Sequence, residues 1–199
     1  MKSRSKYGIA LLALLALLLN SAPSMAAEEE DWRKYQFEAH IAHQNGHDEA
    51  AESHLRKALE GAQKEDRRDP FFRQMLKDSS AIIQTYCTSD KLERAERLAS
   101  DTLSRVQELI DPPSPEETAC WMDLALVLGM KGDKKGQEQI LSRIQSEIER
   151  TAESGKTEIA DAMARVLQDK SREVKGMVKS QFDSVQKQLD GLESLLNKQ

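Results

Sequence analysis

The stretch SPEETACWMDLALVLGMKGDKKGQEQILSRI, residues 114–144, decides the fold class of this chain. It opens with Ser114 and Pro115, a side-chain cap followed by proline at the first helical position, and Glu117 stands where it can complete a capping box. Apolar residues then recur at helical spacing until a polar break at Gly132 separates this helix from a second one. The stretch therefore predicts a helical hairpin.

The same punctuation recurs along the chain, with a second capped start at Asp69-Pro70 and polar breaks at Gly46 and Gly155. The chain has 199 residues, of which 39% are apolar and only 5% aromatic, and its abundance of Ala, Leu, Glu and Lys favours helix. No alternating β-branched run predicts a strand. We expect an all-α chain with helices at residues 31–44, 47–65, 70–87, 91–110, 115–130, 134–152 and 157–197.

The turns between paired helices recur at regular spacing. The segment NGHDEAA at 45–51 is matched by SDKLERA at 89–95 and by KGDKKGQ at 131–137, at separations of 44 and 42 residues. A regular period of this length is typical of a helical solenoid, in which each hairpin packs only on its neighbours.

Small and large apolar residues occupy matched positions of the three hairpins: Ala39, Gly46, Ala51, Leu55 and Ala58; Ile83, Tyr86, Ala95 and Ala99; Trp121, Leu124, Ala125, Leu128, Gly132, Leu141 and Ile144. On these residues, positions 31–152 resemble the tetratricopeptide repeat (TPR) family, in its longer form with a period near 42 residues, familiar from kinesin light chain and many bacterial repeat proteins. The sequence departs from the family pattern at Glu38, Gln137 and Asp90, the last of which replaces the turn glycine. The resemblance implies an α-solenoid of about three TPR-like hairpins in residues 27–154, followed by a long C-terminal helix in 155–199.

The first 26 residues have the pattern of a secretory signal. Three basic residues precede an apolar run at 9–19, and Ser24-Met25-Ala26 places small residues before a cleavage site at Ala27. A retained membrane anchor is the alternative, but this run is short for a hydrocarbon core of about 30 Å. We expect an exported chain, periplasmic or secreted, that does not span the membrane once the signal is removed.

The mature chain is acidic. Removal of Lys2, Arg4 and Lys6 leaves 26 of the 29 basic residues against 34 acidic ones, a formal charge of −8. An acidic chain without a basic stripe is a poor candidate for binding nucleic acid or an anionic membrane surface.

The C-terminal helix carries a heptad pattern over its last three heptads, formed by Val178, Phe182, Val185, Leu189, Leu192 and Leu196. Either this helix folds back on the repeats or it protrudes and pairs with a second chain. Three heptads make a short coiled coil, so packing within the chain or weak self-association through residues 178–196 is favoured over an obligate dimer.

No catalytic motif is present in the sequence, and we expect neither enzymatic activity nor a cofactor. His40, His43 and His47 fall near one face of the first hairpin, where three imidazoles with Asp48 would suit zinc or copper. The alternative, which we favour, is that they are polar surface residues.

Cys87 and Cys120 are predicted on roughly parallel helices of successive hairpins. Their axial offset is about nine residues, which corresponds to about 13 Å at a rise of 1.5 Å per residue. A disulfide requires a shorter distance between the Cα atoms, so we expect no bridge between them.

The resemblance implies a protein or peptide partner bound on the concave surface of the repeats. Carried over position by position, the predicted groove residues are Arg33, Gln36, His40, His43, Gln44, Lys77, Ser80, Gln84 and Thr88. In the third hairpin the matched positions, Met122, Leu126 and Met130, are apolar. They form either a docking patch for a partner or, as we favour, the seat of the helix that begins near Thr157. The leading hypothesis is a non-catalytic adaptor; a self-associating structural protein and an exported metal-binding protein are the alternatives.

Overall fold

In the computed structural model the described residues are 31–196, and every regular element among them is helical. The elements are α2 (Trp32–Gln44), α3 (Asp48–Gly61), the short 3-10 helix η1 (Lys64–Arg68), α4 (Pro70–Thr88), α5 (Leu92–Leu109), α6 (Pro115–Met130), α7 (Lys134–Glu153) and α8 (Thr157–Leu196). The prediction of an all-α chain is confirmed for this part of the chain. The predicted signal, residues 1–26, lies outside the described residues.

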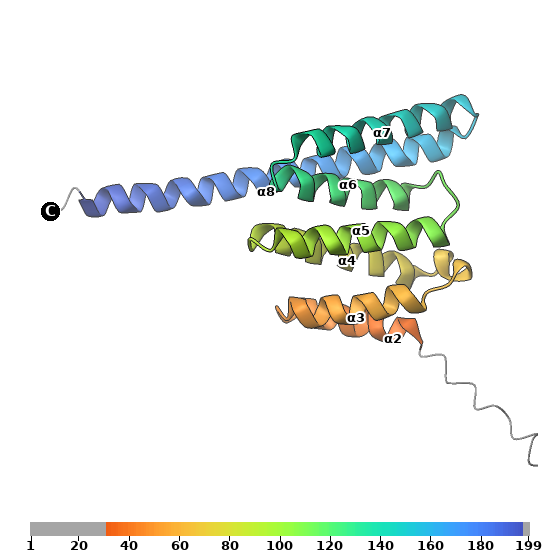
Figure 1. The fold of residues 1–199 in the computed structure, drawn as a ribbon, viewed down its shortest axis with the longest axis horizontal. Helices are drawn as coiled ribbons and strands as arrows, with labels where there is room; N and C mark the ends of the chain where they lie inside the picture. Colours follow the sequence, from red (N-terminus) through yellow and green to blue (C-terminus); the bar gives the residue numbers. More distant parts are fainter. Residues whose placement is uncertain (1–30, 197–199) are drawn as a thin grey trace, which may run out of the picture. The chain divides into compact units, whose positions relative to one another are not determined.

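Successive helices run in opposite directions and pack in pairs, α2 with α3, α4 with α5 and α6 with α7 (Figure 1). The helices α2, α4, α6 and α8 form a series in which each contacts the next, and α3 contacts α5. Helix α8 packs against both α6 and α7, and its ribbon then continues past the ends of these helices (Figure 1).

The turns within the three pairs share one backbone conformation. Gly46, Asp90 and Gly132 all have a positive φ, of 73°, 58° and 82°. The left-handed region costs a residue with a side chain roughly 1–2 kcal/mol, although aspartate enters it more readily than most. Asp90 departs from the turn glycine in residue type, but it makes the same turn as its two counterparts.

Two helices begin at the predicted caps. The Asp69 carboxylate accepts a hydrogen bond from the backbone N–H of Phe71 at 2.8 Å, and the Ser114 hydroxyl accepts one from the N–H of Glu117 at 3.0 Å. The expected return bond of the capping box is replaced, because the Glu117 carboxylate instead accepts from Gln107 and Trp121.

The predicted helix 47–65 ends earlier, at Gly61. The Arg105 guanidinium of α5 donates to the carbonyls of Leu59, Glu60 and Ala62 at 2.8, 3.2 and 2.7 Å. It thereby satisfies acceptors that a continuing helix would have used. The side chain that marks this helix end is 43 to 46 residues away in sequence, so local pattern could not place the boundary.

The core runs between the paired helices. Alanines at the matched positions, Ala39, Ala51, Ala58 and Ala95, are completely buried, and large side chains fill the seams between successive pairs. The most buried large side chains are Leu55, Phe72, Met75, Ile82, Ile83, Tyr86, Leu98, Val106, Val127 and Ile144. Cys87 and Cys120 are buried free thiols in two different hydrophobic clusters, and burial raises the pKa of Cys87 to about 11.

A buried carboxylate joins the first two helical pairs. Glu52 of α3 is 7% exposed, and its oxygens accept hydrogen bonds from Tyr86 at 2.8 Å, from Arg94 at 2.7 Å and from Arg56 at 3.0 Å. Burial alone would raise the pKa of this carboxyl, but the three donors outweigh it and hold the pKa below its ordinary value.

This network predicts acid-sensitive stability. A carboxyl whose pKa is depressed on folding adds stability above its unfolded pKa of about 4.3, and that stability is lost as the pH falls through the folded value. We expect Glu52→Gln to lower the free energy of unfolding by about 1–3 kcal/mol at pH 7 and to flatten its decline at acidic pH. Urea titrations at several pH values measure both effects, with the exposed Glu60→Gln as control. Parallel pH profiles for Glu52→Gln and the natural chain would contradict this assignment.

Candidate functional site

The predicted groove residues lie on α2 and α4, and most of them join one helix to the next. Arg33 of α2 donates to Asp69 at 2.6 Å and to Asp66 at 3.3 Å, ahead of α4. Gln36 and His40, also on α2, both reach Asp78 of α4, each at 2.9 Å. With Gln36 2% and Asp78 3% exposed, this part of the predicted groove is an interface between helices.

A second aspartate holds α4, α6 and α8 together. Asp123 of α6 is 6% exposed and accepts hydrogen bonds from the Ser80 hydroxyl of α4 and the Lys170 ammonium of α8, both at 2.9 Å. Lys170 also contacts Ser80. Burial raises the pKa of the Asp123 carboxyl, while the Lys170 ammonium and the Ser80 hydroxyl favour its ionised form.

Asp78 and Asp123 were absent from the predicted groove residues, although the sequence contains a signal for them. Each stands eight residues after the proline that begins its helix, Pro70 or Pro115. An aspartate in the middle of an otherwise apolar helix face requires a partner. Both aspartates accept hydrogen bonds from neighbouring helices, although the donors differ: Gln36 and His40 reach Asp78, whereas Ser80 and Lys170 reach Asp123.

The remaining groove residues are dispersed. His43 pairs with Asp48 at 2.8 Å, Gln44 bonds to His40 at 2.9 Å, and the Thr88 hydroxyl donates to a backbone carbonyl of its own helix. Lys77 is exposed. Within residues 31–196, no group of three or more His, Cys, Asp or Glu is arranged to hold a metal ion.

Helix α8 covers the apolar positions of the third hairpin. Met122 and Leu126 are 5% and 4% exposed, and Leu167 of α8 packs on the cluster that contains Met122. Further along α8, Val174 and Met177 pack against the cluster that contains Leu126. Glu173 of α8 accepts from Gln84 of α4 at 3.5 Å. Met122 and Leu126 are therefore part of the seat of this chain's own helix, which is the alternative that we favoured from the sequence, and they do not form an open docking patch.

One hollow remains where α4, α6 and α8 meet, and we call it the groove pocket. It has a volume of about 220 Å³. It includes two of the predicted groove residues, Lys77 and Ser80, beside apolar side chains and further charges; its lining is Arg73, Leu76, Lys77, Ser80, Pro115, Glu116, Ala119, Cys120, Asp123, Val166 and Lys170. Arg73 and Lys77 are exposed at its rim, whereas Lys170 is engaged by Asp123.

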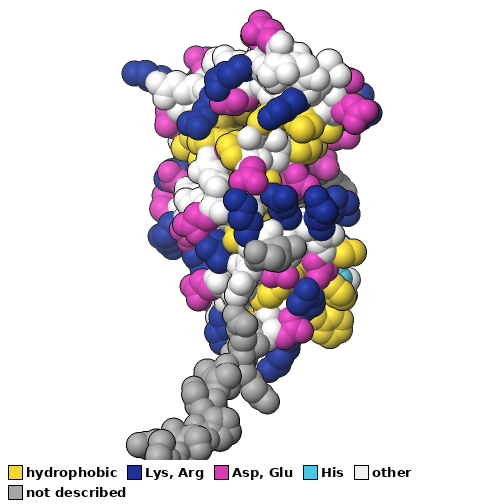
Figure 2. Space-filling model, turned by 90° about the vertical axis from the view of Figure 1, so that its right-hand side faces the viewer, with side chains coloured by type: hydrophobic (Ala, Val, Ile, Leu, Met, Phe, Trp, Pro, Cys, Tyr) yellow, Lys and Arg dark blue, Asp and Glu magenta, His cyan; other side chains and the backbone are white. Residues whose placement is uncertain are grey.

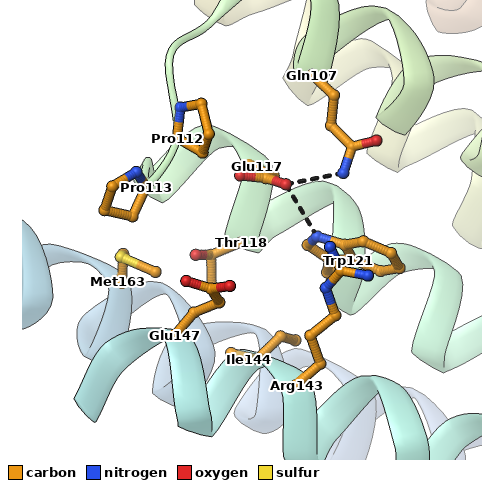
Figure 3. A pocket seen from close by; sticks show the side chains of 10 residues that line it. All are labelled: Gln107, Pro112, Pro113, Glu117, Thr118, Trp121, Arg143, Ile144, Glu147 and Met163. Atoms are coloured by element: carbon orange, nitrogen blue, oxygen red, sulfur yellow. Dashed lines mark hydrogen bonds between the residues drawn. The ribbon is translucent and has the colours of Figure 1, made fainter. Parts of the chain in front are cut away.

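A second hollow, of about 280 Å³, lies beside the α5–α6 connection, and we call it the end pocket (Figure 3). Its lining comes from α5, α6, α7, α8 and the two prolines before α6; the residues are Gln107, Pro112, Pro113, Glu117, Thr118, Trp121, Arg143, Ile144, Glu147 and Met163. The Glu117 carboxylate is held by Gln107 at 2.8 Å and by the Trp121 indole at 3.2 Å, and the Arg143 guanidinium stacks 4.5 Å from the centroid of Trp121.

Figure 2 shows the end of the molecule at which α2, α4, α6 and α8 begin. Hydrophobic side chains form a band across the upper part of this face, and Lys and Arg are interspersed with Asp and Glu below it. Cations of η1 contribute to this mixture, and two of them, Lys64 and Arg67, pair with Asp111 at 2.7 and 3.0 Å.

No protein-family model, no curated protein and no solved structure matches this chain. Among residues 31–196, none of the helices is both long enough and apolar enough to cross a membrane.

The Asp123–Lys170 pair predicts a pattern of mutational coupling. Asp123→Ala leaves the ammonium of Lys170, whose side chain is 16% exposed, without its carboxylate, and we expect a loss of about 3 kcal/mol in unfolding free energy. Asp123→Ala combined with Lys170→Met buries no charge and should recover most of that loss. Denaturant titrations of both single variants and the double variant measure the coupling. The exposed pair Lys64–Asp111 serves as control and should show little coupling, because solvent screens a surface ion pair. A double variant as unstable as the two single losses added together would refute the pairing.

Proposed function

We propose that this protein is an exported, TPR-like α-solenoid that acts as a non-catalytic scaffold and binds a protein or peptide partner along its groove. The observation that carries the proposal is that hydrogen bonds between neighbouring helical pairs recur at nearly one sequence separation. Gln36 bonds to Asp78, 42 residues on, and Ser80 bonds to Asp123, 43 residues on. Arg94 and Glu52, on the other helices of the first two pairs, are also 42 residues apart.

Contacts that recur at nearly one period are expected when identical structural units stack, because each unit meets its neighbour through equivalent positions. This supports three hairpins with α8 as an atypical last helix that covers the open apolar end. The family resemblance and the secretory pattern of residues 1–26 support the TPR-like assignment and export to the periplasm or beyond.

Fewer of the predicted groove residues are available to a partner than the sequence alone predicts. Interface contacts engage Gln36, His40 and Ser80. Among the exposed side chains that remain, Arg73 and Lys77 stand at the rim of the groove pocket, and these are the residues that we assign to the partner. An apolar floor beneath exposed cations suits a peptide with an apolar side chain near a carboxylate.

A photo-crosslinking amino acid at Lys77 tests groove binding, because this exposed residue takes no part in the inter-helix network. We expect crosslinks from envelope extract at position 77 that disappear when Arg73 is changed to Ala. The matched control is the same photo-crosslinker at Lys135, on the exposed side of α7.

A discrete crosslinked species at position 77, absent at position 135, supports the groove. Identical species at both positions, or crosslinks at 77 that do not depend on Arg73, would refute binding in the groove.

Self-association is a second candidate function. It is favoured by the continuation of α8 past α6 and α7 (Figure 1) and by the heptad spacing in the sequence of residues 178–196. Sedimentation equilibrium over a hundredfold range of concentration tests it. We expect a weak dimer that is lost on truncation after Lys175; a concentration-independent monomer would exclude this function.

A further inference from the structure

The end pocket has the size and the walls of a receptor for one side chain. Its volume of about 280 Å³ lies just below the range of about 300–1,000 Å³ found for small-molecule sites. Apolar surface comes from Pro112, Pro113, Ile144 and Met163, and the last two are 2% and 3% exposed. Such walls suit an aliphatic stem of three or four carbons.

Among the described residues, the charged side chains that line the pocket are two carboxylates and one guanidinium. Glu117 comes from α6 and Glu147 from α7, and both are among the side chains that line the pocket (Figure 3). The hydrogen bonds from Gln107 and Trp121 reach the same Glu117 oxygen, Oε1, and hold the carboxylate in place. The one ion pair of Glu147 in the described residues is with Arg150, whose side chain is 69% exposed and therefore readily displaced.

The only cation in the lining, Arg143, is directed elsewhere. Its guanidinium lies over the Trp121 ring at 4.5 Å, an arrangement stabilised by the ring quadrupole. The lining therefore contains two carboxylates against one guanidinium, and that guanidinium is stacked rather than paired with either of them.

We propose that the end pocket binds a lysine or arginine side chain presented by a partner protein. The aliphatic stem lies against Pro113, Ile144 and Met163, and the charged head is paired with Glu147 and Glu117. This site is separate from the groove pocket, since the two share no lining residue, and it does not depend on the function proposed for the groove.

Nuclear magnetic resonance tests the proposal on the full chain, because Trp121 reports from inside the pocket. The chain has two tryptophans, and the second, Trp32, is 4% exposed in the core and serves as an internal reference. The probes are N-acetyl-lysine amide and N-acetyl-arginine amide, with N-acetyl-norleucine amide as the uncharged match to the lysine stem. We expect the cationic amides to shift the Trp121 indole N–H resonance saturably, at millimolar concentration, and to leave that of Trp32 in place.

Glu147→Gln should weaken this binding about tenfold, the typical worth of one charge-assisted hydrogen bond. The matched control is Glu138→Gln, an exposed position on the same helix outside the pocket, which should bind the cationic amides as the natural chain does. Unchanged melting temperatures show that both variants are folded.

Three results would overturn the proposal: an equal shift with norleucine amide, no saturable shift with either cation, or equal affinities in Glu147→Gln and Glu138→Gln.

Discussion

Two carboxylates in the interior, Asp78 and Asp123, constrain how the helices stack. A buried carboxylate is costly unless neighbouring donors satisfy it, and the donors here come mainly from adjacent helices. Gln36 and His40 of α2 reach Asp78, while Ser80 of α4 and Lys170 of α8 reach Asp123. Sliding any of these helices along its neighbour would strand a carboxylate, so the register of the α2–α4–α6–α8 series is tied to these two residues.

The same constraint explains where open surface remains. The ion pair between Lys170 and Asp123 joins α8 to α6. Helix α8 thereby covers Met122 and Leu126, apolar residues of the third hairpin that would otherwise be exposed. Two of the remaining hollows flank α6: the groove pocket lies towards α4, with exposed cations at its rim, and the end pocket lies towards α7, with Glu117 and Glu147 in its lining. Their opposite charge character suits two different contacts on a partner.

Local signals in the sequence predicted the helical elements well, because caps and turns are determined by nearby residues. Ser114 with Pro115 and Asp69 with Pro70 begin helices as expected, and Asp90 makes the same turn as Gly46 and Gly132. The end of α3 was misplaced because Arg105, far along the chain, supplies its terminal hydrogen bonds.

The candidate site was harder to predict, because its contacts also join residues that are far apart in the sequence. The resemblance placed Gln36, His40 and Ser80 on an open groove, whereas these side chains bond to aspartates of the next helix. Whether a polar residue on a helix faces solvent or a partner helix depends on its long-range neighbours. The end pocket combines side chains from four helices and one connection, so no contiguous pattern marks it.

Successive helical pairs stack through contacts about one repeat apart, and zero-length carbodiimide crosslinking tests this arrangement most directly. Three ion pairs at the surface join helical pairs, or the segments that connect them, about one repeat apart: Lys91–Glu49 at 3.3 Å, Lys64–Asp111 at 2.7 Å and Lys131–Glu96 at 2.6 Å. Mass spectrometry of the monomeric product should find all three amide links, at sequence separations of 42, 47 and 35 residues. If these lysines link only to carboxylates of their own helices, the stacked arrangement is contradicted.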